Sequence, residues 1–462
     1  MKDDRTKAWL ALIVLFAVNT LNFYDRQILG AVGETVRDEW KLSDTALGSL
    51  GTAFTLLYAV VGVPLGRLAD RYSRRWILCA GVTVWSLLTA ASGVARNFNE
   101  LFVVRLGVGS GEAVCAPASA SLIGDLFPAS RRAKALSVFM IGLPLGIALS
   151  FLGSSLLEHR FGWRFTFYVA ALPGVFCSVL VLLIWEPVRG AAEALKIHAG
   201  ARRRGSPYLL VLSIPTMWWI IASGALHNFN MYAIGAFLSP FLQRFHHLGK
   251  LNAGMISMVV YGLAGIPGLL IGGMLGDRVG KRKANGRLMV AAIATTSSAP
   301  LMFLGLSMPV GATVGFVFFA GLGMASMYAY YATVYSAIQD VIEPSLRGTA
   351  MALYFFAMYV LGASLGPVGM GFLSNYFTRN AARAAGVTEV SFQALRPFAA
   401  DGLHLALYVV PIFAVLLGIV LYAASRTVAK DMEKLQRWMR ESNNREPSPP
   451  AGSAEAVPAT AN

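Results

Sequence analysis

The chain has 462 residues, of which 56% are hydrophobic and only 14% are charged, and its formal net charge is +15. This much apolar surface cannot be hidden inside one soluble core, so the composition excludes a soluble globular protein and indicates a protein embedded in lipid. The positive charge is explained by membrane topology, as described below, and no nucleic-acid partner is expected.

Apolar stretches that are long enough to span a membrane follow one another through most of the chain. A spanning helix needs about 20 mainly apolar residues, and this window predicts twelve helices, at 8–33, 45–66, 76–95, 99–124, 134–158, 165–185, 215–241, 252–275, 287–307, 311–338, 347–376 and 403–425. Asn22, Asp25 and Arg26 interrupt the first stretch, and no Ala-x-Ala-like cleavage site follows it. We therefore expect the first stretch to remain as a span rather than to be removed as a signal peptide.

The hydrophobic pattern divides the chain into two halves. Residues 186–214 are polar and carry a basic run at Arg202–Arg204, which predicts a cytoplasmic linker between a six-helix bundle at 8–185 and another at 215–425. Residues 426–462 start with apolar residues at helical spacing among Lys and Arg and end in a Pro, Ser and Ala-rich stretch. This pattern predicts an interfacial amphipathic helix followed by a disordered cytoplasmic tail.

Lys and Arg gather in the even-numbered connections and in both tails. An excess of these residues marks the cytoplasmic side of a membrane protein. The sequence therefore predicts an integral protein of the plasma (inner) membrane with both termini in the cytoplasm.

The sequence offers no pattern of an enzyme, a metal site or a cofactor site. Cys79, Cys115 and Cys177 lie in or beside apolar stretches without a CxxC arrangement, so we interpret them as packing residues. His246 and His247 lack the further ligands that a metal would need. The chain contains no GxSxG, HExxH or GxxxxGK[ST] motif, which argues against a hydrolase and an ATP-driven pump.

Two strings in the first half recur in the second half. GRLADRYSRR at Gly66–Arg75 matches GMLGDRVGKR at Gly273–Arg282, and each joins two long apolar stretches. LFPASRRAKALSVF at Leu126–Phe139 aligns with VIEPSLRGTAMALYF at Val341–Phe355. Duplicated bundles related by an axis along the membrane normal are one plan of transporters, which hold their substrate near the midplane between the bundles.

The doubled string resembles the G-x-x-x-D-R-x-G-[RK]-[RK] signature loop of the major facilitator superfamily, and the likeness extends from residue 8 to about 425. NFYDRQIL in the first stretch and RLGVGSGEAVCAPASASLIGDLFP in the fourth resemble the spinster family, whose transporters are linked to sphingosine phosphate and lysophospholipids. The resemblance implies an all-α membrane protein with twelve transmembrane helices in two pseudo-symmetric six-helix bundles. Ser73 replaces the expected Gly of the first loop, which predicts a tighter or strained turn if this position needs a positive φ.

The resemblance also implies that the signature loops gate the cytoplasmic side. Asp70 is expected to face the start of the eleventh span near Arg347. Asp277 is expected to face the start of the fifth span near Arg131, and the positive ends of these helices would favour both carboxylates. Such contacts would hold the bundles together in the outward-facing state, although the arginines can also serve membrane topology alone. The predicted gating residues are Asp70, Arg71, Arg74, Arg75, Arg131, Asp277, Arg278, Lys281, Arg282 and Arg347.

Four ionisable residues lie inside predicted spans, where a charge costs several kcal/mol unless it is paired or hydrated: Asp25, Arg26, Arg105 and Glu112. We interpret Asp25 as a proton carrier that is protonated when desolvated and ionised when it lies beside Arg26 or Arg105. Glu112 follows Arg105 by two helical turns, and it either carries the proton itself or holds Arg105 in place. Asp25, Glu112 and Arg105 are the predicted proton-coupling residues. The alternative is a static ion-pair cluster that braces the first and fourth spans.

The predicted partners are a small amphipathic cargo and protons, and the sequence leaves open whether the protons move with the cargo or against it. Arg26, Arg105 and Glu112 would contact an anionic head group, because guanidinium suits phosphate. Asn230, Tyr232, Tyr328 and Tyr331 of the second half would line the site of the tail, although packing is an equally good explanation for these aromatic residues. A multidrug or organic-anion carrier and a sensor without transport are the alternatives. We expect a monomer in the lipid bilayer, because one chain contains both halves of the cavity.

Overall fold

The chain is helical throughout the part that its computed structural model describes, which comprises residues 2–187, 206–343 and 346–444. The first half contains α1 (Lys2–Trp40), α2 (Asp44–Arg71), α3 (Arg74–Val94), α4 (Phe98–Glu112), α5 (Cys115–Leu126), α6 (Ala129–Phe161) and α7 (Trp163–Leu183). The second half contains α8 (Pro207–Leu212), α9 (Pro215–Arg244), α10 (Lys250–Ser257), η1 (Met258–Leu263), α11 (Gly265–Gly280), α12 (Gly286–Leu306), α13 (Thr313–Val341), α14 (Arg347–Met358), η3 (Tyr359–Ala363), α15 (Leu365–Ala384), α16 (Phe392–Leu395), η4 (Arg396–Phe398), α17 (Ala399–Leu407) and α18 (Val409–Asn444). These ranges contain no strand.

Within the described residues, 11 helical segments are long and apolar enough to cross a membrane, so the chain is an integral membrane protein. Helix α9 occupies the position of the seventh predicted span, but it is not among these segments. Its middle carries His227, Asn228 and Asn230, which lower the hydropathy of any window that includes them. The fold is therefore all-helical as predicted, whereas the count of twelve spans stays a prediction.

Four spans are interrupted within the described residues, and each interruption precedes a proline. One of them is the break at Tyr408 between α17 and α18, where Pro411 cannot donate a hydrogen bond to the Leu407 carbonyl. The break between α4 and α5 begins at Ala113, and Pro117 cannot donate a hydrogen bond to the Ala113 carbonyl. The π-helical turns η1 and η3 end four residues before Pro267 and Pro367, which leave the carbonyls of Leu263 and Ala363 without their usual donors. Proline therefore sets the positions at which these spans change their helical phase.

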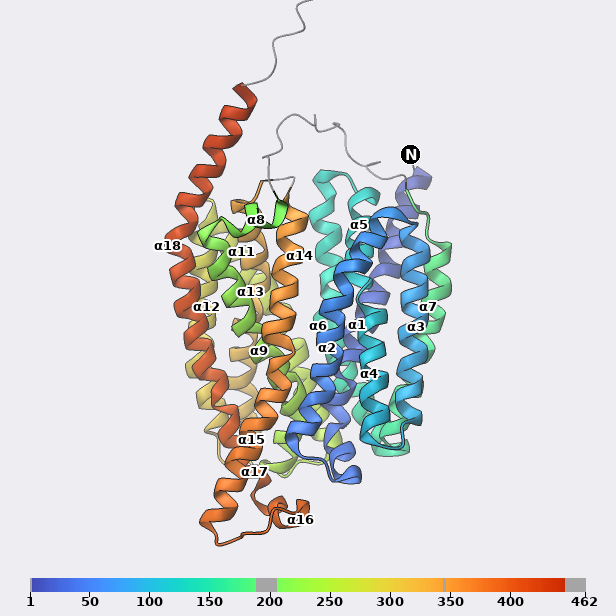
Figure 1. The fold of residues 1–462 in the computed structure, drawn as a ribbon, viewed down its shortest axis with the longest axis vertical. Coiled ribbons are helices and arrows are strands. Elements are labelled where there is room, and N and C mark those ends of the chain that lie inside the picture. Colours follow the sequence, from blue (N-terminus) through green and yellow to red (C-terminus); the bar gives the residue numbers. More distant parts are fainter. Residues whose placement is uncertain (1, 188–205, 344–345, 445–462) are drawn as a thin grey trace, which may run out of the picture.

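Helices α1 to α7 gather on one side of the molecule and α9 to α18 on the other (Figure 1). The N-terminus and the last turns of α18 lie at the same end, which we call the terminal end, and we call the opposite end the far end. Helix α1 packs against α9, α2 against α15, and α6 against α10 and η1. These contacts join the two groups of helices.

The hydrophobic core shows where the two groups are closed. One cluster of buried residues joins both groups and includes Phe151 and Trp163 of the first with Phe237 and Tyr261 of the second. Two further clusters each belong to a single group, around Trp85 in the first and around Tyr330, Val334 and Leu417 in the second. The first cluster reaches the far end of the helices and the other two extend toward the terminal end. Among the described residues, the cluster with buried members from both groups is therefore the one at the far end.

The segment after Arg426 is a continuation of α18 rather than a separate helix lying on the membrane surface. Val428 and Met432 pack against the core of the second group, and the Asp431 carboxylate accepts a hydrogen bond from the Thr216 backbone at 3.0 Å. The helix predicted from residue 426 therefore continues the last span in this structure and packs against α9, while the domain boundaries stay a prediction. The tail beyond residue 444 and most of the predicted linker, at 188–205, lie outside the described residues.

Candidate transport site

The centre of the candidate site is a buried ion pair between Arg26 of α1 and Glu112 at the end of α4. The Nε of Arg26 lies 2.9 Å from Oε2 of Glu112, whose residue is 0% exposed. Asn22, one turn before Arg26, donates to the same oxygen at 2.9 Å. Glu112 therefore pairs with Arg26. Helical spacing alone had suggested Arg105 as the partner of Glu112.

Aromatic side chains surround the Arg26 guanidinium. Its carbon lies 4.4 Å from the centroid of the Tyr58 ring, 4.9 Å from Phe23 and 5.3 Å from Phe54, which are cation–π distances. Its Nη1 also donates to the hydroxyls of Tyr232 at 3.3 Å and Tyr359 at 3.1 Å. Because both tyrosines belong to the second group of helices, Arg26 connects the two halves of the molecule.

Asp25 and Arg105 are buried without comparable partners. Asp25 is 2% exposed, accepts one hydrogen bond at 3.3 Å from Thr89 of α3, and has a second carboxyl oxygen without a hydrogen-bond partner. Arg105 is 1% exposed, and its Nε and Nη1 also lack hydrogen-bond partners among the described residues. The Arg105 guanidinium lies 5.1 Å from the Phe54 centroid, so this aromatic ring is its clearest neighbour.

A cavity of about 40 Å³ lies beside the two arginines. Arg26, Arg105 and Phe54 line it from the first group, and Tyr232 and Pro367 line it from the second. The space suits a water molecule and is far too small for a lipid. The arrangement can attract an anionic group, but the helices must move before a large molecule can enter.

The predicted residues of the second half divide into two sets. Tyr232 contacts Arg26, as described above, and Tyr331 is half-buried beside His227 with ring centroids 4.8 Å apart. Asn230 instead donates to the Val410 carbonyl at 3.0 Å, and Tyr328 donates to the Tyr261 carbonyl at 2.8 Å. These last two bonds join helices of the second group, and neither residue has a contact with Arg26 or Arg105 among the described interactions.

Sequence reasoning missed three hydrogen-bonding residues of this site, Asn22, Thr89 and Tyr359, and the three rings of Phe23, Phe54 and Tyr58 around Arg26. The sequence could have indicated Asn22, because it lies four residues before Arg26 and therefore on the same helical face. Thr89 and Tyr359 have no such signal, because a threonine and a tyrosine in apolar stretches are ordinary residues of membrane helices.

Comparison with known proteins decides the family. The model of the Major Facilitator Superfamily matches residues 15–367. The chain belongs to the major facilitator superfamily. It is thus related to transporters rather than to enzymes, as the signature loops indicated.

Individual relatives narrow the resemblance within the superfamily. An "MFS-type efflux pump" of Mycolicibacterium smegmatis is 31% identical over 80% of this chain and 86% of that protein. "Protein spinster homolog 1" of Mus musculus is 28% identical over 82% of this chain and 75% of that protein. The crystal structure of a bacterial homolog of the human lysosomal transporter Spinster, inward-facing and unoccupied, has 25% identity and a TM-score of 0.80 over 92% of this chain and 98% of that chain. The expected resemblance of this major facilitator protein to spinster proteins is confirmed.

The first major facilitator signature loop makes its described contacts within its own half. Arg74 is buried and pairs with Asp125 of α5 and with Glu186, the latter at 3.2 Å. Arg75 donates to the Leu182 and Ile184 carbonyls at 3.1 Å and 3.3 Å, at the end of α7. The side chains of Asp70 and Arg71 lie outside the described residues, so their predicted gating contacts stay predictions.

Ser73 does not strain the first loop. Its φ of −60° and ψ of 120° are an ordinary extended conformation, and its hydroxyl donates to Glu186 at 2.5 Å. This position therefore does not need a positive φ. Ser73 precedes the first residue of α3 in an extended conformation, and its side chain binds Glu186. Burial raises the pKa of Glu186, but the donors Ser73 and Arg74 outweigh burial and lower this pKa below its usual value.

The second major facilitator signature loop is more exposed. Asp277 pairs with Arg287 of α12 at 3.0 Å, and Arg287 also pairs with Asp340 of α13. Asp277 does not contact Arg131 in this structure, in which the two groups of helices share a core at the far end. The Asp277–Arg131 contact was predicted for the outward-facing state and stays a prediction. The remaining predicted gating residues have exposed side chains: Arg131, Arg278, Lys281, Arg282 and Arg347.

Proposed function

We propose that the protein is a secondary active transporter that works by alternating access and couples transport to protons. Its cargo is an amphipathic anionic lipid, such as a lysophospholipid or a sphingosine-phosphate-like molecule. In this proposal α9 is the seventh of twelve spans and completes the count. The two groups of helices are two six-helix bundles, and both termini lie in the cytoplasm of a plasma (inner) membrane protein.

The observation that carries the proposal is the buried Asp25, which has one carboxyl oxygen without a hydrogen-bond partner. A charged carboxylate at such a place would be costly, whereas its protonated form is neutral and can donate. Asp25 therefore suits a residue that gains and loses a proton as its access to water changes. Glu112 also has one carboxyl oxygen without a hydrogen-bond partner, but it suits this role less well because its other oxygen is paired with the Arg26 guanidinium, which favours the ionised form.

A static ion-pair cluster explains only part of the site. Arg26 and Glu112 fit that alternative, because they are paired at 2.9 Å. Arg105 fits it less well, since its buried guanidinium has two nitrogens without hydrogen-bond partners and no ion pair among the described residues. We assign to Arg105 the binding of the anionic head group, which would supply the missing acceptors.

The shared core at the far end supports an inward-facing arrangement, in which the terminal end is the cytoplasmic side. The cavity beside Arg105 is too small for the cargo, so binding requires the half-buried Tyr232, Tyr331 and Tyr359 to separate from α1. Such aromatic side chains with a polar tip suit the acyl part of an amphipathic molecule near its head group.

A second function, export of drugs or small organic anions by the same proton-coupled machinery, is favoured by the relative named as an efflux pump. The two arginines beside the cavity would serve a carboxylate as well as a phosphate. The two functions differ in whether the apolar part of the cargo is an acyl chain.

The experiment is the flux of a labelled lysophospholipid into proteoliposomes, with and without an imposed pH gradient. We expect the gradient to accelerate flux in the unchanged protein and to lose this effect in Asp25→Asn. Asp401→Asn, which changes an exposed carboxyl of α17, is the control and should retain the effect. Absence of lysophospholipid flux together with gradient-driven flux of a small organic anion would replace the lipid by the second function.

A further inference from the structure

We propose that Arg244, Glu34 and Asp44 form an ionic latch that closes the far end of the molecule and must break before the central site can open to that side. This inference rests on the alternating access proposed above. The latch residues lie in odd-numbered connections or at the ends of the adjoining helices, away from the signature loops.

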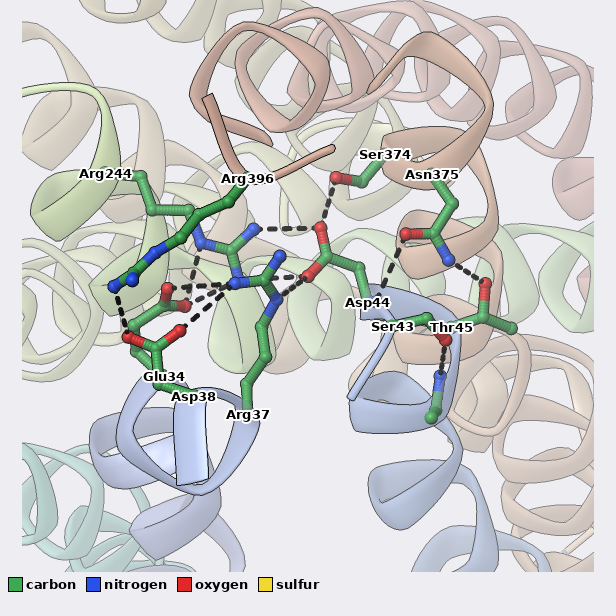
Figure 2. A network of polar contacts seen from close by, with 11 residues as sticks. Glu34, Arg37, Asp38, Ser43, Asp44, Thr45, Arg244, Ser374, Asn375 and Arg396 are labelled. Atoms are coloured by element: carbon green, nitrogen blue, oxygen red, sulfur yellow. Dashed lines mark hydrogen bonds and ion pairs between the residues drawn. The ribbon is translucent and has the colours of Figure 1, made fainter. Parts of the chain in front are cut away.

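Arg244 is the second group's member of the latch. Its Nη1 and Nη2 each lie 2.9 Å from a different carboxyl oxygen of Asp44. Its Nε lies 2.8 Å from Oε2 of Glu34 (Figure 2). A guanidinium that binds one carboxylate with two parallel hydrogen bonds and a second carboxylate beside it is held in a single orientation. Arg244, at the last turn of α9, thereby joins the end of α1 to the start of α2.

Arg37 completes the charge balance from the side of the first group. Its Nε lies 2.8 Å from Oδ1 of Asp44, and its Nη1 lies 3.4 Å from Glu34. Arg37 also lies 3.5 Å from Asp38, which pairs with Arg396 of the second group at 3.0 Å. Three arginines thus face three carboxylates. Glu34, Arg37 and Asp44 all belong to the first group, so separation of the groups leaves that group with an excess negative charge and leaves Arg244 without a partner.

Polar contacts from α15 strengthen the closure. The Ser374 hydroxyl donates to Oδ2 of Asp44 at 2.5 Å, and the side-chain oxygen of Asn375 accepts from the backbone N–H of Asp44 at 3.2 Å. Asn375 also donates to the Thr45 hydroxyl at 2.8 Å (Figure 2). Residues from α9 and from α15 therefore converge on the start of α2.

Burial distinguishes this network from a surface salt bridge. The side chain of Asp44 is 1% exposed, and those of Arg37 and Arg244 are each 7% exposed. Exposed ion pairs contribute little, but removal of one partner of a buried pair leaves an uncompensated charge. Once the far end opens, water solvates the separated charges and weakens their attraction. The latch therefore favours the closed state as long as its charges stay buried.

Close backbone packing brings the latch residues within reach of one another. A Cβ atom on Gly48 of α2 would lie 2.2 Å from the Pro367 carbonyl oxygen of α15. A Cβ atom on Gly30 of α1 would lie 2.2 Å from the Gly235 carbonyl oxygen of α9. Both positions require glycine for this approach. Backbone contact and ion pairing thus act together at the same end.

The test measures the distance across the far end by pulsed electron paramagnetic resonance, on the full chain in lipid nanodiscs. Spin labels are placed at two exposed positions, Asn99→Cys in the first turn of α4 and Val310→Cys between α12 and α13. The native cysteines of this background are replaced by alanine. We expect one short distance in the unchanged latch. Arg244→Gln should shift most of the distribution to a longer distance, and Arg244→Lys should shift it less.

The matched control is Arg164→Gln, which breaks a far-end ion pair with Glu39 at 2.7 Å inside the first group. This control should leave the distance unchanged. Gly48→Leu should open the far end by steric contact, which shows that the labels can report opening and covers the case in which Arg244→Gln fails to fold. Asp44→Asn provides a second ionic variant.

An unchanged distance in folded Arg244→Gln and Asp44→Asn, together with a shift in Gly48→Leu, would overturn the latch. This measurement needs no cargo. Failure of lysophospholipid flux with an intact shift would therefore count against the proposed cargo, and normal flux without the shift would count against the latch alone.

Discussion

The guanidinium of Arg26 donates to the hydroxyl of Tyr359 at 3.1 Å, across the boundary between the two groups of helices. Tyr359 is the first residue of the π-helical turn η3, whose position is set by Pro367. The same guanidinium pairs with Glu112. A movement of one group against the other therefore changes the hydrogen bonds of Arg26 and, through it, the surroundings of the Glu112 carboxylate.

Arg26→Ala is expected to destabilise the protein strongly. The substitution leaves Glu112 buried without its cation, a change that costs about 3–5 kcal/mol. Tyr359→Phe keeps the ring and removes one hydrogen bond, so its cost should be about 1 kcal/mol. Thermal unfolding in detergent, followed by tryptophan fluorescence, compares the two variants. Equal melting temperatures would contradict the structural role of the Arg26–Glu112 pair.

Arg105→Gln is expected to abolish cargo flux without lowering stability. The guanidinium has no ion pair among the described residues, so its replacement removes a desolvated charge rather than a favourable contact. The melting temperature should stay the same or rise, while lysophospholipid flux in proteoliposomes falls at least about tenfold, the equivalent of 1.4 kcal/mol. A lower melting temperature with retained flux would show that Arg105 serves folding instead.

Asn230→Ala should affect stability rather than cargo binding. Asn230 donates to the Val410 carbonyl, and the variant leaves this buried acceptor unpaired at a cost of about 1–3 kcal/mol. We expect a lower melting temperature and an unchanged cargo Kd, measured by binding of a fluorescent lysophospholipid. Tyr232→Phe, which removes a hydrogen-bond acceptor of Arg26, is the comparison and should weaken binding. An unchanged melting temperature together with a higher cargo Kd in Asn230→Ala would show that Asn230 belongs to the binding site.

Glu186 is expected to make the stability of the terminal end depend on pH. Burial raises its pKa, but hydrogen bonds from Ser73 and Arg74 lower it overall, so the folded-state pKa lies below the unfolded value of about 4.3. The ionised carboxylate therefore stabilises the fold above this pH, and the contribution disappears as the pH falls through the folded-state pKa. Melting temperatures measured between neutral and acidic pH should fall less steeply in Glu186→Gln, and Ser73→Gly should lose part of the effect. Parallel curves for all three proteins would exclude this carboxylate as the cause.

The positions of most helices and the charged core of the site were readable from the sequence, because hydropathy and spacing are local properties. The apolar stretches predicted the helices to within several residues, and the signature loops predicted the family. Asp25, Arg26, Arg105 and Glu112 stood out because charge is costly within an apolar stretch. Only α9 is too polar to satisfy the hydropathy window that its neighbours satisfy.

Tertiary structure alone decided which of these groups are partners. Helical spacing placed Glu112 on the face of Arg105, but the tertiary structure pairs it with Arg26 and leaves two nitrogens of Arg105 without hydrogen-bond partners among the described residues. Glu34, Asp44 and Arg244 looked like ordinary charges near loops, and they form one network only because α9 and α15 pack against α1 and α2. A sequence determines which segments prefer lipid, whereas pairing across 200 residues depends on how those segments pack in three dimensions.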